Sequence, residues 1–480
     1  MIVLGTIMTI LDTTIVNVAL KDLSTDLNTS LTGIQWVATG YLLSLAAVIP
    51  VTGWAATRFG TRRLYLISLV LFTAGSALCG LARSSEELIA FRVLQGVGGG
   101  MLAPLGQMIL VRTAGPRNLP RVMGAIGVPM LLAPVFGPTI GGLLLEHAGW
   151  QWIFLVNLPV GIVAFFFASR MLPRDDGRGA LAGNLDAVGL GLLSTGLVGI
   201  TYGLAEIGTS GSVTSGKVLI PLLLGLVLVA SFVWRALRIP NPLLNVRLYA
   251  NKAFAAASLT TFCLGAALFG AMILMPLYFQ TVRGEDAVHT GLLLIPQGIG
   301  AAIAMFFSGR ATERFGGGLT ALFGGIVTLL TTIPFVLIGG NTSFVLLGVA
   351  MVIRGFGIGM SFMPSMTAAW AVLRPEEINT GTPQLNVLQR VGGSIGTAIL
   401  TVVLQNHLQD LGASPTRDAM AGAFSTAYVW VLGVTAVSLL PTFLLMVVER
   451  RTRRARAAAA GPTPEAPAPA PAEALAEAAA

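Results

Sequence analysis

The chain has 480 residues, of which 54% are hydrophobic and only 10% are charged, and its formal net charge is +8. Together with a mean hydropathy of +0.81, this composition excludes a water-soluble protein, whose core could not bury so many apolar residues. The sequence predicts an all-α polytopic membrane protein. Two cysteines, Cys79 and Cys263, lie in separate apolar runs, a spacing that predicts neither a disulfide framework nor a metal site.

Fourteen apolar runs follow one another along the chain, and each is long enough to cross a bilayer, since about 20 apolar residues span the hydrocarbon. They lie near residues 1–20, 33–56, 64–82, 88–111, 122–145, 152–171, 186–206, 217–236, 254–279, 290–309, 319–339, 343–369, 382–404 and 425–447. The first run contains Asp12, so we expect a retained helix and not a cleaved signal peptide. At the other end, the basic and Ala/Pro/Glu-rich segment 449–480 predicts a disordered cytoplasmic tail.

The distribution of basic residues predicts the orientation in the membrane. The side that holds the C-terminus carries 21 Lys and Arg residues, and the other side carries five. Because basic loops stay in the cytoplasm, we expect a multi-pass protein of the inner (plasma) membrane with both termini cytoplasmic. The same asymmetry accounts for the positive net charge without a nucleic-acid partner.

Two short patterns recur at nearly equal offsets. The turn at residues 53–60 returns 256 positions later at 309–316, and the glycine-rich segment at 96–101 returns 259 positions later at 355–360. Such offsets indicate duplication of a multi-helix half, as in many secondary transporters.

The length of the repeat predicts the domain organisation. A six-helix half needs about 190–200 residues, at roughly 20 residues per span plus loops, so the surplus of about 60 fits two inserted helices. We therefore expect an N-terminal six-helix bundle at 1–172, two inserted helices with linkers at 173–252, and a C-terminal six-helix bundle at 253–448.

Four motifs give the chain a family resemblance over nearly all of residues 1–450. They are LDTTIVNVAL at 11–20, the turn at 53–63, RVLQG at 92–96 and PVFGPTIGG at 134–142. In this order the chain resembles the major facilitator superfamily, and within it the fourteen-helix drug:proton antiporter family. The resemblance implies export of drugs or antibiotics by alternating access, driven by the proton gradient, with no enzymatic activity, cofactor or metal.

Asp12 is the only acidic residue that we place deep inside a span. Burial disfavours the ionised carboxylate, whereas a cationic ligand or water favours it, so Asp12 can exchange a proton for a substrate. The alternative is a neutral structural carboxyl that is hydrogen-bonded to Thr13 or Asn17.

Arg92 is the basic counterpart of Asp12, since a guanidinium at membrane depth needs polar or anionic partners. The resemblance assigns this arginine to proton coupling. In the alternative, Arg92 extends to the outer interface, because Glu86 and Glu87 lie shortly before it.

A third group is expected to act in gating. Small residues let helices approach closely, and a proline bends a helix into a pivot; the alternatives are generic packing and anchoring of cytoplasmic loops. Thr57 stands where the family usually has an aspartate that pairs with a nearby arginine and helix terminus to latch the outward-facing state. The second copy keeps an acid, Glu313, beside Arg314, so the resemblance implies a latch that is weaker in the first half or shifted to the second. The gating candidates are Gly53, Arg58, Gly60, Arg62, Gly137, Pro138, Gly141, Gly142, Glu313 and Arg314.

Aromatic and amide residues in the spans are candidate substrate contacts, because an amphipathic cavity with aromatic walls suits flat lipophilic compounds. The alternative is that they form interfacial belts or hold helices together. With a single deep carboxylate, we expect monocationic, zwitterionic or neutral substrates. An exporter of one endogenous metabolite and a proton-independent facilitator are the other functional readings. The candidates are Trp36, Tyr41, Gln95, Tyr278, Gln280, Gln297, Asn386 and Gln389.

Overall fold

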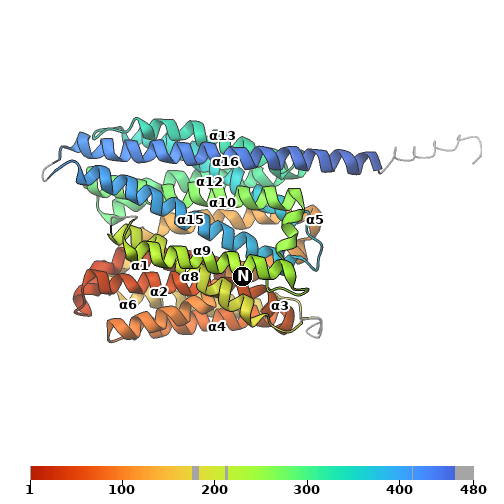
Figure 1. Ribbon diagram of the computed structural model, residues 1–480. Helices are drawn as coiled ribbons and strands as arrows, with labels where there is room; N and C mark the ends of the chain where they lie inside the picture. Colours follow the sequence, from red (N-terminus) through yellow and green to blue (C-terminus); the bar gives the residue numbers. More distant parts are fainter. Residues whose placement is uncertain (1, 176–182, 211–213, 413–414, 460–480) are drawn as a thin grey trace, which may run out of the picture.

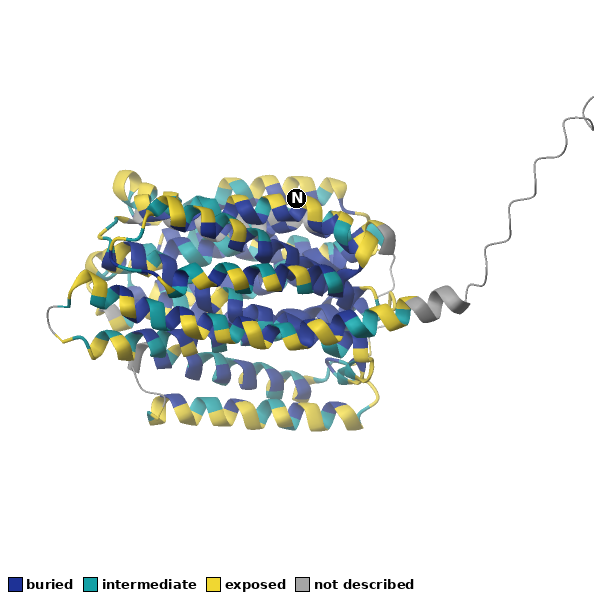
Figure 2. Ribbon diagram, turned by 90° about the horizontal axis from the view of Figure 1, so that it is seen from above, coloured by how far each residue is buried: buried dark blue, intermediate teal, exposed yellow. Residues whose placement is uncertain are grey.

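The computed structural model describes residues 2–175, 183–210, 214–412 and 415–459, and every regular element among them is a helix. The helices lie side by side in two groups, with the N-terminal third of the chain on one side and the C-terminal half on the other (Figure 1). Buried residues gather between the helices, and exposed residues lie on their outward faces (Figure 2).

The first bundle contains the helices that precede residue 172. A kink divides its longest helix, α5, at Gly115, whose φ of 67° is readily available only to glycine. The two parts of α5 correspond to the expected runs at 88–111 and 122–145. The elements of this bundle are α1 (Ile2–Asp26), α2 (Leu31–Val48), η1 (Ile49–Val51), α3 (Thr52–Phe59), α4 (Thr61–Gly80), α5 (Ser85–Ala148), α6 (Gln151–Leu155) and α7 (Asn157–Met171).

Two inserted helices lie between the bundles in sequence, and the first of them packs against both bundles. Helix α8 (Ala187–Ser210) packs against its neighbour α9 (Gly216–Arg238), against α2 and against α15 of the second bundle. The Ser194 hydroxyl donates a hydrogen bond to the carbonyl of Ala47, 2.6 Å away, and so fixes α8 to the first bundle. Helix α9 exposes a row of large apolar side chains, as a lipid-facing helix does.

The second bundle repeats the plan of the first. Its elements, preceded by η3 (Val246–Ala250), are α10 (Lys252–Met272), α11 (Leu274–Leu277), η4 (Tyr278–Val282), α12 (Ala287–Phe315), α13 (Gly317–Val336), α14 (Phe344–Trp370), α15 (Ile378–Gln409) and α16 (Arg417–Ala459).

The expected disordered tail at 449–480 is wrong for its first part, because α16 continues to Ala459. The carboxylate of Glu449 accepts hydrogen bonds from the backbone N–H groups of Gly317, at 3.1 Å, and Gly318, at 2.6 Å. These donors have no partner within α13, so packing against α13 holds this turn of α16 in place. Residues 460–480 lie outside the described part of the chain.

Thirteen helices in the described part are long and apolar enough to span a membrane. The helical stretch of α5 after Gly115 occupies the position of the remaining expected run. The observed architecture is therefore that of the expected all-α polytopic protein.

Helix α5 of the first bundle packs along α12 of the second, from Arg121 beside Gly309 to Thr139 beside Gly291. In addition, a shared apolar cluster joins the two bundles at one end of the molecule. We call it the basic end; it carries the turns around Gly60 and Gly316 and their neighbouring arginines. One cluster of buried apolar side chains near this end includes residues of both bundles, among them Leu105, Met305 and Met366. At the opposite end each bundle has its own separate cluster. The bundles are thus closed against each other at the basic end.

Candidate functional site

A buried ion pair joins α1 to α5 inside the first bundle. One carboxylate oxygen of Asp12 accepts a hydrogen bond from Nη1 of Arg92, 2.5 Å away, and both residues are 1% exposed. A charge-assisted contact of this kind is among the strongest hydrogen bonds in proteins. The structure therefore places the two expected coupling residues in direct contact.

Polar side chains from α4, α5 and α7 complete the surroundings of Asp12. Its second oxygen accepts from Nε2 of Gln95, at 2.9 Å, and from Nδ2 of Asn157, at 3.3 Å. Gln95 also accepts from Arg92, at 2.8 Å, and Asn157 donates to the hydroxyl of Ser76, at 3.1 Å. Both oxygens of Asp12 face donors, which is the arrangement that an ionised carboxylate requires.

Aromatic rings and one backbone carbonyl enclose the guanidinium. Cζ of Arg92 lies 4.0 Å from the ring centroid of Tyr41 and 5.6 Å from that of Phe154. Nε of Arg92 donates to the carbonyl of Val37, 3.1 Å away. The Tyr41 hydroxyl is buried and has no hydrogen-bond partner among the described residues. Arg92 is therefore held by polar and aromatic partners inside the bundle and does not extend to the interface.

Glycines explain why the helices around Asp12 lie so close together. A Cβ on Gly137 would overlap the side chain of Thr14, and a Cβ on Gly141 would lie 3.2 Å from Cγ2 of Ile15. These glycines let α5 pack against α1 within one turn of Asp12. Gly142 is half-buried, and Pro138 has a helical backbone, but its side chain lies outside the described part of the chain.

A neutral contact joins the bundles at the basic end. The amide of Asn379 on α15 donates a hydrogen bond to the Thr57 hydroxyl on α3, 2.8 Å away. Close to it, a Cβ on Gly53 would overlap the carbonyl oxygen of Asn379. Thr57 therefore contributes a hydroxyl at the place where the family has a carboxylate.

The basic-end turn of the first bundle receives an acid from elsewhere in the chain. Asp175, in the segment after α7, accepts hydrogen bonds from the backbone N–H groups of Arg62 and Arg63, at 3.0 and 3.1 Å. It thereby caps α4, as Glu449 caps α13, which favours both helix N-termini electrostatically. Gly60, with a φ of 89°, makes the sharp turn before α4.

The other gating candidates differ in their surroundings. Arg62 is half-buried and donates through Nη2 to the carbonyl of Ser169, 2.5 Å away. Arg58, Glu313 and Arg314 are exposed, and none of the three forms an ion pair within the described residues.

The structure places the candidate substrate contacts at several different sites. Tyr41 and Gln95 belong to the Asp12 network, and Asn386 donates a hydrogen bond across the bundles to Gln107, at 2.6 Å. Tyr278 donates to the carbonyl of Gly339, 2.7 Å away, far from that network.

The remaining candidates lie at other places. Trp36 stacks on Tyr202 of α8, Gln280 is exposed, and the Gln389 side chain is buried. Gln297 accepts a hydrogen bond from Arg354, at 3.4 Å.

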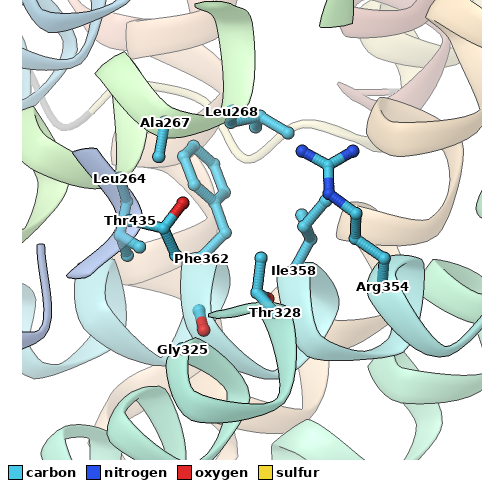
Figure 3. Close-up of a pocket in the computed structure, with 10 residues that line it drawn as sticks. Leu264, Ala267, Leu268, Gly325, Thr328, Arg354, Ile358, Phe362 and Thr435 are labelled. Atoms are coloured by element: carbon cyan, nitrogen blue, oxygen red, sulfur yellow. The ribbon is translucent and has the colours of Figure 1, made fainter. Parts of the chain in front are cut away.

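A pocket in the second bundle is lined on one side by Arg354. Helices α10, α13, α14 and α16 form its walls, and Leu264, Leu268, Ile358 and Phe362 contribute large apolar side chains (Figure 3). Sequence reasoning placed Arg354 in or beside a span but gave it no role.

Sequence reasoning also missed Asn157 and Ser76. Both are small polar residues within apolar runs, a signal that many helix-packing residues share. Only the packing of α4 and α7 around α1 shows that they belong to the Asp12 network.

Comparison with known proteins bears on the whole chain. Residues 2–397 match the model of the Major Facilitator Superfamily. The chain is 43% identical to the multidrug resistance protein B homolog of Mycobacterium tuberculosis over 405 residues, which are 84% of this chain and 75% of that protein. It is 31% identical to the methylenomycin A resistance protein of Bacillus subtilis over 435 residues, 89% of this chain and 92% of that one.

A solved structure supports the same fold. The proton:xylose symporter XylE aligns with a TM-score of 0.61 at 14% identity, over 90% of this chain and 93% of that one. With relatives and fold in agreement, the chain is a membrane transporter and not an enzyme, and it belongs to the Major Facilitator Superfamily.

Proposed function

We propose that this protein is a proton-coupled antiporter that exports lipophilic drugs or antibiotics by alternating access. The observation that carries the proposal is the buried contact between Asp12 and Arg92, inside a network with Gln95 and Asn157. The names of the drug-resistance relatives support the drug-export part of the proposal. No cofactor is needed, because the proton gradient supplies the energy.

Proton transfer to Asp12 would change the contacts between three helices. In the ionised state the carboxylate holds Arg92 of α5 and Asn157 of α7. A proton removes the negative charge and leaves the buried guanidinium without its counter-ion, which is costly in a low-dielectric interior. Helices α1, α5 and α7 then favour another arrangement. The tight glycine contacts of α5 with α1 lie within one turn of Asp12, so they would change when Asp12 is protonated.

The closed basic end gives the transport cycle its starting point. With the positive-inside orientation, this end faces the cytoplasm, so the present arrangement is closed to the cytoplasm. A substrate would enter when the shared apolar cluster and the contact between Thr57 and Asn379 separate. Rocking of one bundle against the other around a central site is the usual form of alternating access.

Two alternatives make different predictions. An exporter dedicated to one endogenous metabolite would move a single compound, as the methylenomycin resistance name of one relative allows. A proton-independent facilitator would equilibrate its substrate and tolerate the loss of the Asp12 carboxylate.

The test is dye uptake into inverted membrane vesicles under an imposed proton gradient. Rhodamine 123 and fluorescein share a three-ring scaffold but differ in charge, so together they do not presuppose the charge of the substrate. We expect protonophore-sensitive uptake of at least one dye by the wild type, and a loss of at least tenfold in Asp12→Asn. Asp22→Asn, which changes an exposed acid on the same helix, should retain wild-type uptake.

Persistent gradient-driven uptake in Asp12→Asn would place the coupling group elsewhere. Wild-type uptake that is unchanged by the protonophore would favour the proton-independent facilitator.

A further inference from the structure

We propose that the exported substrate is a lipophilic organic anion whose acidic group is held by Arg354. This inference rests on the export function proposed above and specifies its substrate class. It replaces the expectation of a monocationic, zwitterionic or neutral substrate, which treated Asp12 as a carboxylate available to the ligand.

Arg354 is a buried cation with no counter-ion among the residues that the structure describes. It is 3% exposed, and its one hydrogen bond in the described structure is the 3.4 Å contact of Nη1 with Oε1 of Gln297. Nε has no partner among the described residues, and no described carboxylate forms an ion pair with the side chain. Its Cζ lies 5.8 Å from the ring centroid of Phe335. Arginine stays protonated in proteins, so a buried charge with one long hydrogen bond and one distant ring contact favours an anionic ligand.

The duplicated halves show what is missing beside Arg354. In the first half, Asp12 of α1 neutralises the arginine on α5. The residue 256 positions after Asp12, at the offset of the repeated turns, is Leu268 on α10. Figure 3 shows the Leu268 side chain beside the guanidinium of Arg354. Arg354 lies 262 positions after Arg92, so the two arginines do not share the offset that relates Asp12 to Leu268. The second half nevertheless has a buried arginine with apolar Leu268 in the same pocket, and an acidic group of the substrate can supply the missing negative charge.

The pocket walls indicate the rest of the ligand. Leu264, Leu268, Ile358 and Phe362 offer apolar surface on one side of the guanidinium. The pocket is narrow in the present arrangement, so a ligand would enter when the helices of the second bundle that line it move apart. One acidic group on a lipophilic body satisfies both the cation and the walls.

A second arginine in the spans makes a cationic substrate unfavourable. Arg390 on α15 is half-buried, interacts electrostatically with Tyr41 and forms no ion pair among the described residues. The charge of Arg92 is balanced by Asp12, whereas Arg354 and Arg390 have no ion-pair partner in the described part of the chain. A lipophilic cation would meet net repulsion at this depth, where charges are weakly screened.

Equilibrium binding to the purified full-length protein tests the proposal without any proton gradient. Fluorescence anisotropy gives the Kd of fluorescein, an anion, and of rhodamine 123, a cation of the same scaffold. We expect the wild type to bind fluorescein at least tenfold more tightly than rhodamine 123. Arg354→Gln should weaken fluorescein binding about 10- to 100-fold, the range for loss of a charged hydrogen bond, with rhodamine 123 binding not weakened.

Two further substitutions separate ligand binding from a purely structural role of Arg354. Arg354→Lys keeps the charge and should restore most of the fluorescein affinity that Arg354→Gln loses. Leu268→Asp supplies an internal counter-ion and should also weaken fluorescein binding at least tenfold. Leu268→Asn introduces a side chain of the same shape as aspartate but without its charge, and its Kd for fluorescein should stay within about threefold of the wild-type value. Thermal unfolding identifies any variant that is misfolded.

The outcomes distinguish this inference from the proposed function. Fluorescein binding that depends on Arg354 but is not accompanied by proton-driven uptake would support the site and contradict proton-coupled export. Tighter binding of rhodamine 123 than of fluorescein by the wild type would overturn the anion proposal. Equal fluorescein affinity of the wild type and Arg354→Gln would overturn it as well, and neither result would contradict the proposed export. Wild-type protein that binds neither dye would also count against a site for lipophilic anions.

Discussion

Asp12 accepts hydrogen bonds from three side chains, and only one of the donors, Arg92, is charged. Taking both charges out of water is costly, and their mutual attraction with good geometry offsets that cost. Removing one partner therefore does more harm than removing both. A single substitution that costs more stability than the double substitution therefore identifies a buried ion pair whose two residues stabilise each other.

We predict that Arg92→Gln lowers the stability of the protein by about 3–5 kcal/mol, because it leaves the Asp12 carboxylate buried without a counter-ion. The double variant Asp12→Asn/Arg92→Gln should recover much of that loss. Thermal unfolding of the detergent-purified proteins measures both. A double variant that is no more stable than Arg92→Gln would show that the pair does not couple energetically.

Asp12, Arg92 and Asn157 differ in how far the sequence alone identifies them. The sequence identified Asp12 and Arg92 because a charge inside an apolar run is conspicuous and costly. It left open whether Arg92 extends to the interface, since its partner is 80 positions away and only packing brings the two together. Asn157 lies 145 positions from Asp12 and is uncharged, so neither its spacing nor its composition identifies it.

The thickness of the bilayer makes the number and position of the helices predictable from the sequence. The residues at which the helices end are less predictable. Run lengths are set by membrane thickness, and the inserted helices appear at 187–210 and 216–238, close to the expected 186–206 and 217–236. The end of α16 was not predictable from the tail composition, because its anchoring depends on the contact of Glu449 with α13.

Helices α3 and α15 meet so closely that a single methyl group should disturb them. We predict that Gly53→Ala separates α3 from α15, because the new Cβ overlaps the carbonyl oxygen of Asn379. Transport should fall several-fold. Labelling of a single cysteine measures the separation. Ser365→Cys, at a buried position of α14, is made in protein that lacks Cys79 and Cys263, and its cysteine should react faster with N-ethylmaleimide when Gly53→Ala is also present.

The matched control is Gly422→Ala on α16, where a Cβ would meet no atom within 4 Å. It should leave both transport and labelling unchanged. Equal labelling of Ser365→Cys with and without Gly53→Ala would show that the contact between α3 and α15 does not keep the basic end closed.

For the whole molecule, the distribution of apolar clusters defines the arrangement of the two bundles. Both bundles share one cluster at the basic end, and each has its own cluster at the other end. The bundles are thus closed against each other at the basic end, while α5 of the first packs along α12 of the second. Sequence duplication predicted the two bundles, but not which end is closed, because the closure depends on contacts between residues that are far apart in the chain.

The apolar neighbour of Arg354 has a consequence for the electrical work of transport. An anion that leaves the cell while a proton enters moves two elementary charges in the same direction, whereas a monocation exchanged for a proton moves none. Since one charge crossing 100 mV is worth about 2.3 kcal/mol, each cycle would gain about 4.6 kcal/mol from that potential. In proteoliposomes without a pH gradient, a potassium diffusion potential set with valinomycin should then drive fluorescein transport, and reversing its sign should reverse the flux. A flux that is insensitive to the potential would contradict this coupling, whereas a sensitive flux would mean that the protein carries a net current with every molecule that it exports.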